Sequence, residues 1–247
     1  MKGPQRLEFL ALLALGLGLG GLLWLWLGQT IATDLAFLSL LDVRLEQSLR
    51  GQWSPAAELL WQSLSRFGGV TILPWVVALV SAGLFAGRRF FEGLLLSLGA
   101  ASLALLVEVM KIAVDRPRPP LGLALGTPAF PSGHSSLALL VYGLIALLLQ
   151  GQLPSRWLRS SALLCLGALI LVISWSRLGL GVHWLSDVLG GWVLAAVWLF
   201  LLWLAWRAYR RRYPPPLLTP RQRLWGNGAM ILLTAAWLVI LLQAFSP

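Results

Sequence analysis

The chain consists of long apolar segments separated by short polar ones. A hydrocarbon core about 30 Å thick is crossed by a helix of roughly 20 apolar residues, and the apolar segments approach that length. We predict six membrane-spanning helices and an extra seventh near the C-terminus, at residues 7–28, 68–87, 90–114, 135–149, 160–175, 185–206 and 224–245. The pattern favours an all-α fold, a polytopic membrane helix bundle in which residues 1–247 form a single membrane domain.

The stretch between the first two predicted spans has a different pattern. Leucines recur three and four positions apart, the spacing of one helix face, at Leu35, Leu38, Leu41, Leu45 and Leu49. Charged residues share the stretch, and a break at residues 51–55 divides it. We interpret residues 34–67 as interfacial amphipathic helices on the outer membrane surface, which either gate a lipid entrance or simply connect two spans.

Composition agrees with a membrane location. Hydrophobic residues make up 58% of the chain and charged residues 11%, and the mean hydropathy is +0.81, which excludes an ordinary soluble domain. The net charge of +10 does not indicate nucleic-acid binding, because the basic residues fall at the ends of spans rather than on one polar face. The first span follows Lys2 and Arg6, and we expect it to be an uncleaved signal anchor rather than a cleaved signal peptide.

The basic residues also indicate the topology. If the N-terminus lies inside, twelve of the nineteen lysine and arginine residues lie on the cytoplasmic side. Cytoplasmic loops of membrane proteins carry the excess of positive charge, so this orientation is the favoured one. The basic residues that it places on the outer side are Arg44, Arg50, Arg66, Lys111, Arg116, Arg118 and Arg177.

Only two histidines occur in the chain, and each lies in a short polar motif. His183 and Asp187 are four residues apart at the start of a predicted span, so they lie on one face of a helix. Asp187 can then accept a hydrogen bond from one imidazole nitrogen and leave the lone pair of the other nitrogen facing a substrate. An aspartate inside a membrane span is costly unless it is paired, which favours a functional role.

The second histidine, His134, follows Pro131, Ser132 and Gly133 just before another predicted span. Ser132 can cap the helix, and Gly133 lets the backbone approach a ligand closely. The unpaired N–H groups at a helix start attract phosphate. His134 is therefore placed to donate a proton to a leaving oxygen as a general acid.

Basic side chains flank both histidine motifs. Lys111, Arg118 and Arg177 could clamp the three non-bridging oxygens of a transferred phosphoryl group, as its transition state demands. Arginine suits this role because its planar fork binds two oxygens at once. The charge-based topology places all of these residues at the same membrane face, so we predict one phosphoryl-transfer site that acts through a phosphohistidine.

Two carboxylates lie near the clamp in the sequence. We interpret Asp115 and Arg116 as a supporting salt bridge, and Glu108, one helical turn before Lys111, as the partner of that lysine. We expect no metal, because two histidines and scattered carboxylates form no cluster of ligands.

Three motifs together resemble the signature of the type 2 phosphatidic acid phosphatase superfamily. They are Lys111-x6-Arg118-Pro119, Pro131-Ser132-Gly133-His134 and Ser176-Arg177-x5-His183-x3-Asp187. The resemblance implies a six-helix core with its site at the outer face, within a catalytic core that we place at residues 90–206, and no cofactor. It implies that His183 is the nucleophile, Asp187 its orienter and His134 the acid. The phosphate ligands that it implies are Lys111, Arg118, Ser132, Gly133 and Arg177.

The resemblance further implies a lipid phosphatase of the bacterial inner (cytoplasmic) membrane, with the site facing the periplasm or outside. Its partners would be the bilayer and a membrane lipid phosphate, and nothing in the chain specifies an oligomeric state. Undecaprenyl diphosphate and glycerolipid phosphates, such as phosphatidylglycerol phosphate or phosphatidic acid, rank ahead of lipid A phosphates by analogy. Two other functions stay open: transfer of the phosphate to a second lipid, and non-catalytic lipid binding or transport.

Overall fold

The computed structural model describes residues 36–50, 54–120, 122, 125–150, 153 and 155–213. All regular secondary structure in these ranges is helical, which confirms the predicted all-α class for this part of the chain. The predicted spans 7–28 and 224–245 lie outside the described residues. The elements are α2 (Ala36–Arg50), α3 (Pro55–Ser65), the 3-10 helix η1 (Arg66–Gly68), α4 (Leu73–Ala86), α5 (Phe90–Val114), α6 (Gly133–Gln150), α7 (Arg156–Gly179) and α8 (Leu185–Arg212).

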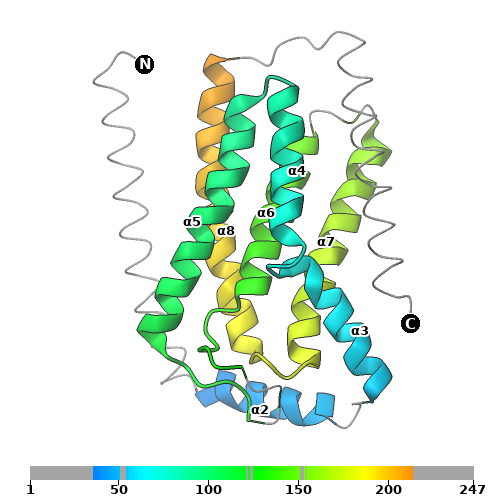
Figure 1. Ribbon diagram of the computed structural model, residues 1–247, viewed down its shortest axis with the longest axis vertical. Coiled ribbons are helices and arrows are strands. Elements are labelled where there is room, and N and C mark those ends of the chain that lie inside the picture. The colour runs from blue at the N-terminus through cyan, green and yellow to red at the C-terminus, as the bar shows by residue number, and fades with distance from the viewer. Residues whose placement is uncertain are drawn as a thin grey trace.

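Long apolar helices make this a multi-pass membrane protein. Within the described ranges, five segments are long and apolar enough to cross a membrane: Pro55–Ala86, Phe90–Val114, Gly133–Gln150, Arg156–Gly179 and Leu185–Arg212. Helix α6 packs against α5, α7 and α8, and α4 packs against α5. In Figure 1 the helices α4 to α8 run along one another, while α2 lies across one end of the bundle.

The apolar segment 55–86 is bent. Helix α3 begins after Ser54, whose hydroxyl accepts a hydrogen bond from the Ala57 N–H at 3.2 Å. It packs against α7 and then gives way to a turn at residues 66–72, which we call the elbow, before α4 begins. The second span, predicted at residues 68–87, begins inside this elbow. The amphipathic helix predicted just before that span, at the membrane interface, corresponds to α3 and lies along the side of α7 (Figure 1).

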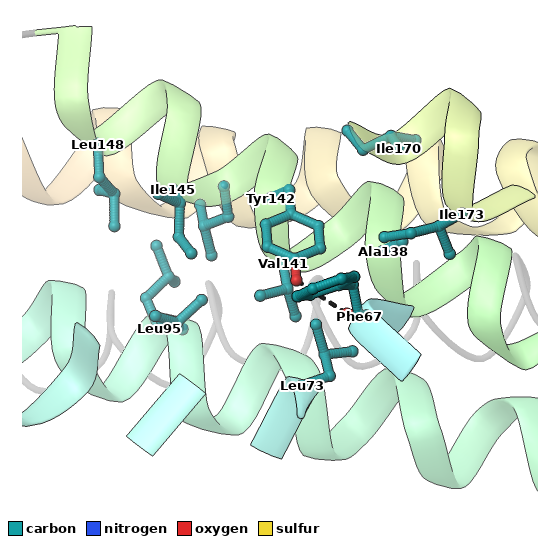
Figure 2. Close-up of a cluster of buried hydrophobic side chains, with 12 residues drawn as sticks. Phe67, Leu73, Leu95, Ala138, Val141, Tyr142, Ile145, Leu148, Ile170 and Ile173 are labelled. Atoms are coloured by element: carbon teal, nitrogen blue, oxygen red, sulfur yellow. Dashed lines mark hydrogen bonds between the residues drawn. The ribbon is translucent and has the colours of Figure 1, made fainter. Parts of the chain in front are cut away.

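The elbow is fixed to the bundle by an apolar cluster and one buried hydrogen bond. Phe67 and Leu73 belong to the same buried cluster as Val141 and Ile173. Figure 2 shows the Tyr142 hydroxyl directed at the Phe67 backbone, where it donates to the carbonyl oxygen at 2.8 Å. A buried hydroxyl is costly unless it is hydrogen-bonded, so this contact favours one position of the elbow.

The ends of four helices meet where α2 covers the bundle (Figure 1). These are the end of α5, the start of α6, the end of α7 and the start of α8. The start of α8 lies against the start of α6, because a Cβ added at Gly191 would be 2.7 Å from Ser136 Oγ and 2.9 Å from the Ser132 carbonyl oxygen. The residues before α6 and before α8 are thereby brought together.

Candidate active site

His183 and Asp187 form a buried pair at the start of α8. Their side chains are 3% and 0% exposed, respectively, and His183 Nδ1 lies 3.5 Å from Asp187 Oδ2. The same Oδ2 accepts a hydrogen bond from the Trp184 N–H at 2.8 Å, which directs the carboxylate toward the imidazole. Among the described residues His183 Nδ1 has no hydrogen-bond partner at standard geometry, so a small shortening of this contact would complete the pair.

The other imidazole nitrogen of His183 faces a group of cations. His183 Nε2 lies 3.4 Å from Arg118 Nη1. Burial lowers the pKa of His183 well below its usual range, and the charges of Arg177, Arg118 and Lys111 lower it further. The imidazole is therefore neutral at physiological pH, and Nε2 carries a lone pair when Nδ1 holds the proton. This is the state that a nitrogen nucleophile requires.

Arg118 is held by the loop between α5 and α6 and by the loop between α7 and α8. Its Nε donates to the Thr127 carbonyl at 2.6 Å, and its Nη1 donates to the Val182 carbonyl at 2.5 Å. Its Nη2 donates to Thr127 Oγ1 at 2.9 Å and to the Pro128 carbonyl at 3.2 Å. Burial lowers the pKa of Arg118, although Asp187 and Glu108 oppose this effect. All four hydrogen-bond acceptors are neutral, so they orient the guanidinium beside His183 without cancelling its charge.

Arg177 and Lys111 add two more cations. Arg177, at the end of α7, is buried; its Nη1 donates to Ser65 Oγ, and its Nε is buried without a partner in the described part of the chain. Lys111 Nζ lies 2.8 Å from Glu108 Oε1, so the predicted pair exists, but Glu108 is 61% exposed and the pair is not buried. The unused Nε of Arg177 is a donor available to a phosphate oxygen.

The start of α6 carries the second histidine motif. The Ser132 N–H donates to the Asp187 carbonyl at 3.0 Å, which ties the motif to α8, and the Ser132 hydroxyl hydrogen-bonds Ser135 Oγ at 3.1 Å. A Cβ at Gly133 would lie 3.9 Å from Lys111 Nζ. His134 meets the elbow, because a Cβ at Gly69 would be 2.8 Å from His134 Nε2. The glycine at position 69 therefore leaves room for that imidazole.

The predicted salt bridge between Asp115 and Arg116 is wrong. Asp115 ends α5 with a φ of 45° and is exposed, whereas Arg116 turns into the bundle. Its Nη1 donates to Asp187 Oδ1 at 2.5 Å, and its Nη2 donates to Asp42 Oδ2 at 2.9 Å. A buried carboxylate needs a cation far more than an exposed carboxylate does. This explains why Arg116 binds the buried Asp42 and Asp187 rather than the exposed Asp115 beside it in the chain.

Sequence reasoning missed two residues of this network, Asp42 and Ser186. Ser186 Oγ accepts from Arg116 Nη1 at 2.6 Å, and both Asp42 and Ser186 are buried. One signal was present in the sequence. Asp42 is four residues after Leu38 and three before Leu45, so it lies on the apolar face of α2 rather than on the solvated face. A carboxylate in that position calls for a buried partner.

A cavity of about 260 Å³ opens beside His134 and Arg177. Helix α3, the elbow, the loop before α6 and the end of α7 contribute its walls, which include Gln62, Arg66 and Thr71. In the described residues no three His, Cys, Asp or Glu side chains lie together as metal ligands would. The cavity and the cations around His183 can thus accept an anionic group with a bulky substituent.

Comparisons with known proteins give one family. The model of the PAP2 superfamily matches residues 92–212. Phosphatidylglycerophosphatase B of Bacillus subtilis (strain 168) is 33% identical to this chain over 143 residues, which cover 56% of this chain and 70% of that protein.

Two solved structures are similar. The crystal structure of the transmembrane PAP2-type phosphatidylglycerolphosphate phosphatase from Bacillus subtilis aligns with a TM-score of 0.69 and 25% identity, over 81% of this chain and 98% of that one. Aquifex aeolicus LpxE aligns with a TM-score of 0.51 and 17% identity, over 69% of this chain and 97% of that one, a likeness of fold alone.

Proposed function

This chain belongs to the PAP2 superfamily and is a membrane lipid phosphatase, and from that premise we propose that it works without a metal, through a phosphohistidine on His183. The observation that carries the proposal is the environment of His183. One imidazole nitrogen faces a buried carboxylate, and the other faces an arginine within a group of cations. Such an arrangement supplies a neutral nucleophile and fixed positive charge for the phosphoryl oxygens.

The proposed reaction has two steps. In the first, the lone pair of His183 Nε2 attacks phosphorus, and the bond from phosphorus to the lipid oxygen breaks. Protonated His134 gives its proton to that oxygen, while Asp187 stabilises the positive charge that develops on His183. In the second step, neutral His134 takes a proton from water, the resulting hydroxyl attacks phosphorus, and the N–P bond breaks. Inorganic phosphate leaves, and both histidines return to their starting states.

The cavity beside His134 gives the leaving group a place. A general acid must lie next to the leaving oxygen, so the part of the substrate attached to that oxygen extends from His134 into the space lined by Gln62, Arg66 and Thr71. The proposed substrates are undecaprenyl diphosphate and glycerolipid phosphates such as phosphatidylglycerol phosphate or phosphatidic acid. The relation to phosphatidylglycerophosphatase B supports the glycerolipid class.

The orientation in the membrane is also a proposal. The end of the bundle that carries the site has Lys111, Arg116, Arg118 and Arg177, all of which contribute to the site. The opposite end, at the starts of α5 and α7 and the end of α8, has more basic residues: Arg88, Arg89, Arg156, Arg159, Arg207 and Arg210–Arg212. The positive-inside tendency then supports a site at the outer face of a bacterial inner membrane.

The test is phosphate release by the purified protein with a chelator present. Undecaprenyl diphosphate, phosphatidylglycerol phosphate, phosphatidic acid and lipid A would each be supplied, with the His183→Ala variant as the control. We expect release from at least one lipid, complete loss in His183→Ala, and an acid-labile phosphoenzyme in rapidly quenched wild type. Full activity in His183→Ala, or inhibition by chelator that a divalent metal reverses, would contradict the proposal. If phosphate appears only on an added acceptor lipid, the reaction is phosphotransfer.

A further inference from the structure

We propose that Asp42 on α2 is a positioning residue of the reaction: through Arg116 it holds the Asp187 carboxylate in the orientation that His183 needs. The inference rests on the proposed function, because it assigns a role within the phosphohistidine mechanism. It gives α2 a part in the chemistry, whereas the sequence pattern suggested only an interfacial connector or a lipid gate.

The contacts of Asp42 use both of its oxygens. Asp42 is 3% exposed; its Oδ1 accepts a hydrogen bond from the Ser186 N–H at 2.9 Å. Its Oδ2 accepts from Arg116 Nη2 at 2.9 Å and from Ser186 Oγ at 2.5 Å. The carboxylate therefore binds the first turn of α8 and the residues just after α5 at the same time.

Arg116 transmits this contact to Asp187. Its two terminal nitrogens point to different carboxylates, Nη1 to Asp187 and Nη2 to Asp42, and its guanidinium carbon lies 5.8 Å from the centre of the Trp184 ring. A planar guanidinium that is bound at both ends cannot rotate freely. Asp187 Oδ1 is consequently fixed by Arg116, which leaves Oδ2 directed at the Trp184 N–H and at His183 Nδ1.

The charges in this cluster explain why an asparagine could not replace Asp42 as the partner of Arg116. Two carboxylates share one guanidinium, and Arg118, on the His183 side, adds further positive charge near Asp187. An asparagine at position 42 offers one oxygen where the aspartate offers two, and its NH₂ group would face donors that already point inward. Arg116 would lose its ionic partner on α2 and could shift toward Asp187, which would disturb the pair with His183.

Helix α2 has other means of staying in place. Its leucines Leu45 and Leu49 are half-buried and line a small pocket together with Leu178, Trp184 and Leu185, and α2 packs against both α7 and α8. Burial of such side chains stabilises the packing independently of the Asp42 charge. The Asp42→Asn protein should therefore fold, and its effect on the reaction can be measured.

The experiment is a double-mutant cycle. Asp42→Asn is introduced into wild type and into Asp187→Asn, and kcat and KM are measured with ³²P-labelled lipid. In the wild-type background we expect kcat to fall about 10- to 100-fold, the range found when a residue that orients a metal ligand is removed, with KM changed less than about twofold. In the Asp187→Asn background the loss should shrink to less than about threefold, because Asp42 acts through Asp187.

Controls separate positioning from a general structural role. Arg44→Gln changes the charge of an exposed residue on the same helix and should leave kcat unchanged. Asp42→Glu restores the charge and should recover part of the activity that Asp42→Asn loses.

An equal loss in both backgrounds, a change in KM alone, an Asp42→Glu no better than Asp42→Asn, or failure of Asp42→Asn to fold would overturn the role of Asp42. If wild type releases no phosphate, or His183→Ala remains active, it is the phosphohistidine function that fails.

Discussion

Replacing Gly69 with alanine should impair the acid step. The elbow places this glycine against His134, and an added Cβ would lie 2.8 Å from Nε2, 0.6 Å inside the ordinary contact distance of 3.4 Å. Gly69 has a φ of −98° and a ψ of 175°, which alanine also adopts, so the backbone itself would not be strained. The imidazole, rather than the elbow, must move, because the Tyr142 hydroxyl and the apolar cluster hold the elbow in place.

The size of the effect follows from that displacement. A shift of 1 Å in a catalytic group costs about 100-fold in rate, so a shift of the size needed here should cost about 10-fold in kcat, or about 1.4 kcal/mol of transition-state stabilisation. The loss should be larger with Gly69→Val. It should be smaller with an aryl phosphate, whose weakly basic leaving oxygen needs little help from an acid.

The assay compares phosphate release from a lipid phosphate and from p-nitrophenyl phosphate. Gly83→Ala is the matched control, since a Cβ at this position in α4 has no atom within 4 Å. Wild-type kcat on the lipid in Gly69→Ala, or an equal loss on both substrates, would refute the reasoning that His134 donates the proton from this position.

Three further changes have defined outcomes. Asp187→Asn should leave lipid binding intact and lower kcat by about 10⁴-fold, as loss of tautomer control does in a catalytic triad; binding and turnover measured separately would check this, and a large loss of binding would contradict it. Tyr142→Phe should remove the hydrogen bond to the Phe67 carbonyl and lower the free energy of unfolding by about 1 kcal/mol, and an unchanged denaturation midpoint would count against that contact. The folded-state pKa of His183 is lowered, so between that pKa and about 6.5 the unfolded chain binds the proton and the folded chain does not. Stability should therefore fall as the pH drops below about 6.5, with a shallower fall in His183→Asn; equal slopes would argue against a neutral, buried His183.

The part of the site that sequence could predict depends on local spacing and on helix direction. His183 and Asp187 are four residues apart on one helix, so their contact follows from helical geometry alone. The meeting of the motifs around Lys111, His134 and Arg177 follows from spans that alternate in direction. Long apolar segments likewise specified the bundle, because a membrane permits few alternatives to a helix.

The missed features depend on contacts between residues far apart in the chain. Arg116 and Asp42 are 74 residues apart, and no local pattern shows that α2 crosses the end of the bundle to bring them together. The same limit explains the wrong salt bridge between Asp115 and Arg116. That prediction rests on the adjacency of the two residues in the chain, whereas the partners of Arg116 are determined by the burial of the carboxylates. The contact between Gly69 and His134 is also long-range, and a glycine in an apolar segment more often indicates the close packing of two helices than room for a catalytic side chain.

The guanidinium shared between α2 and α8 bears on how the protein is made. Asp42 is near the start of the chain and Asp187 belongs to the last described helix, so the ribosome has delivered every intervening span before these two groups can meet. Until then Arg116 lacks one of its two carboxylates, and the proposed nucleophile His183 lacks the carboxylate that orients it. A chain that is only partly inserted therefore has no assembled site with which to attack the lipids around it, and catalytic competence begins only with the entry of α8.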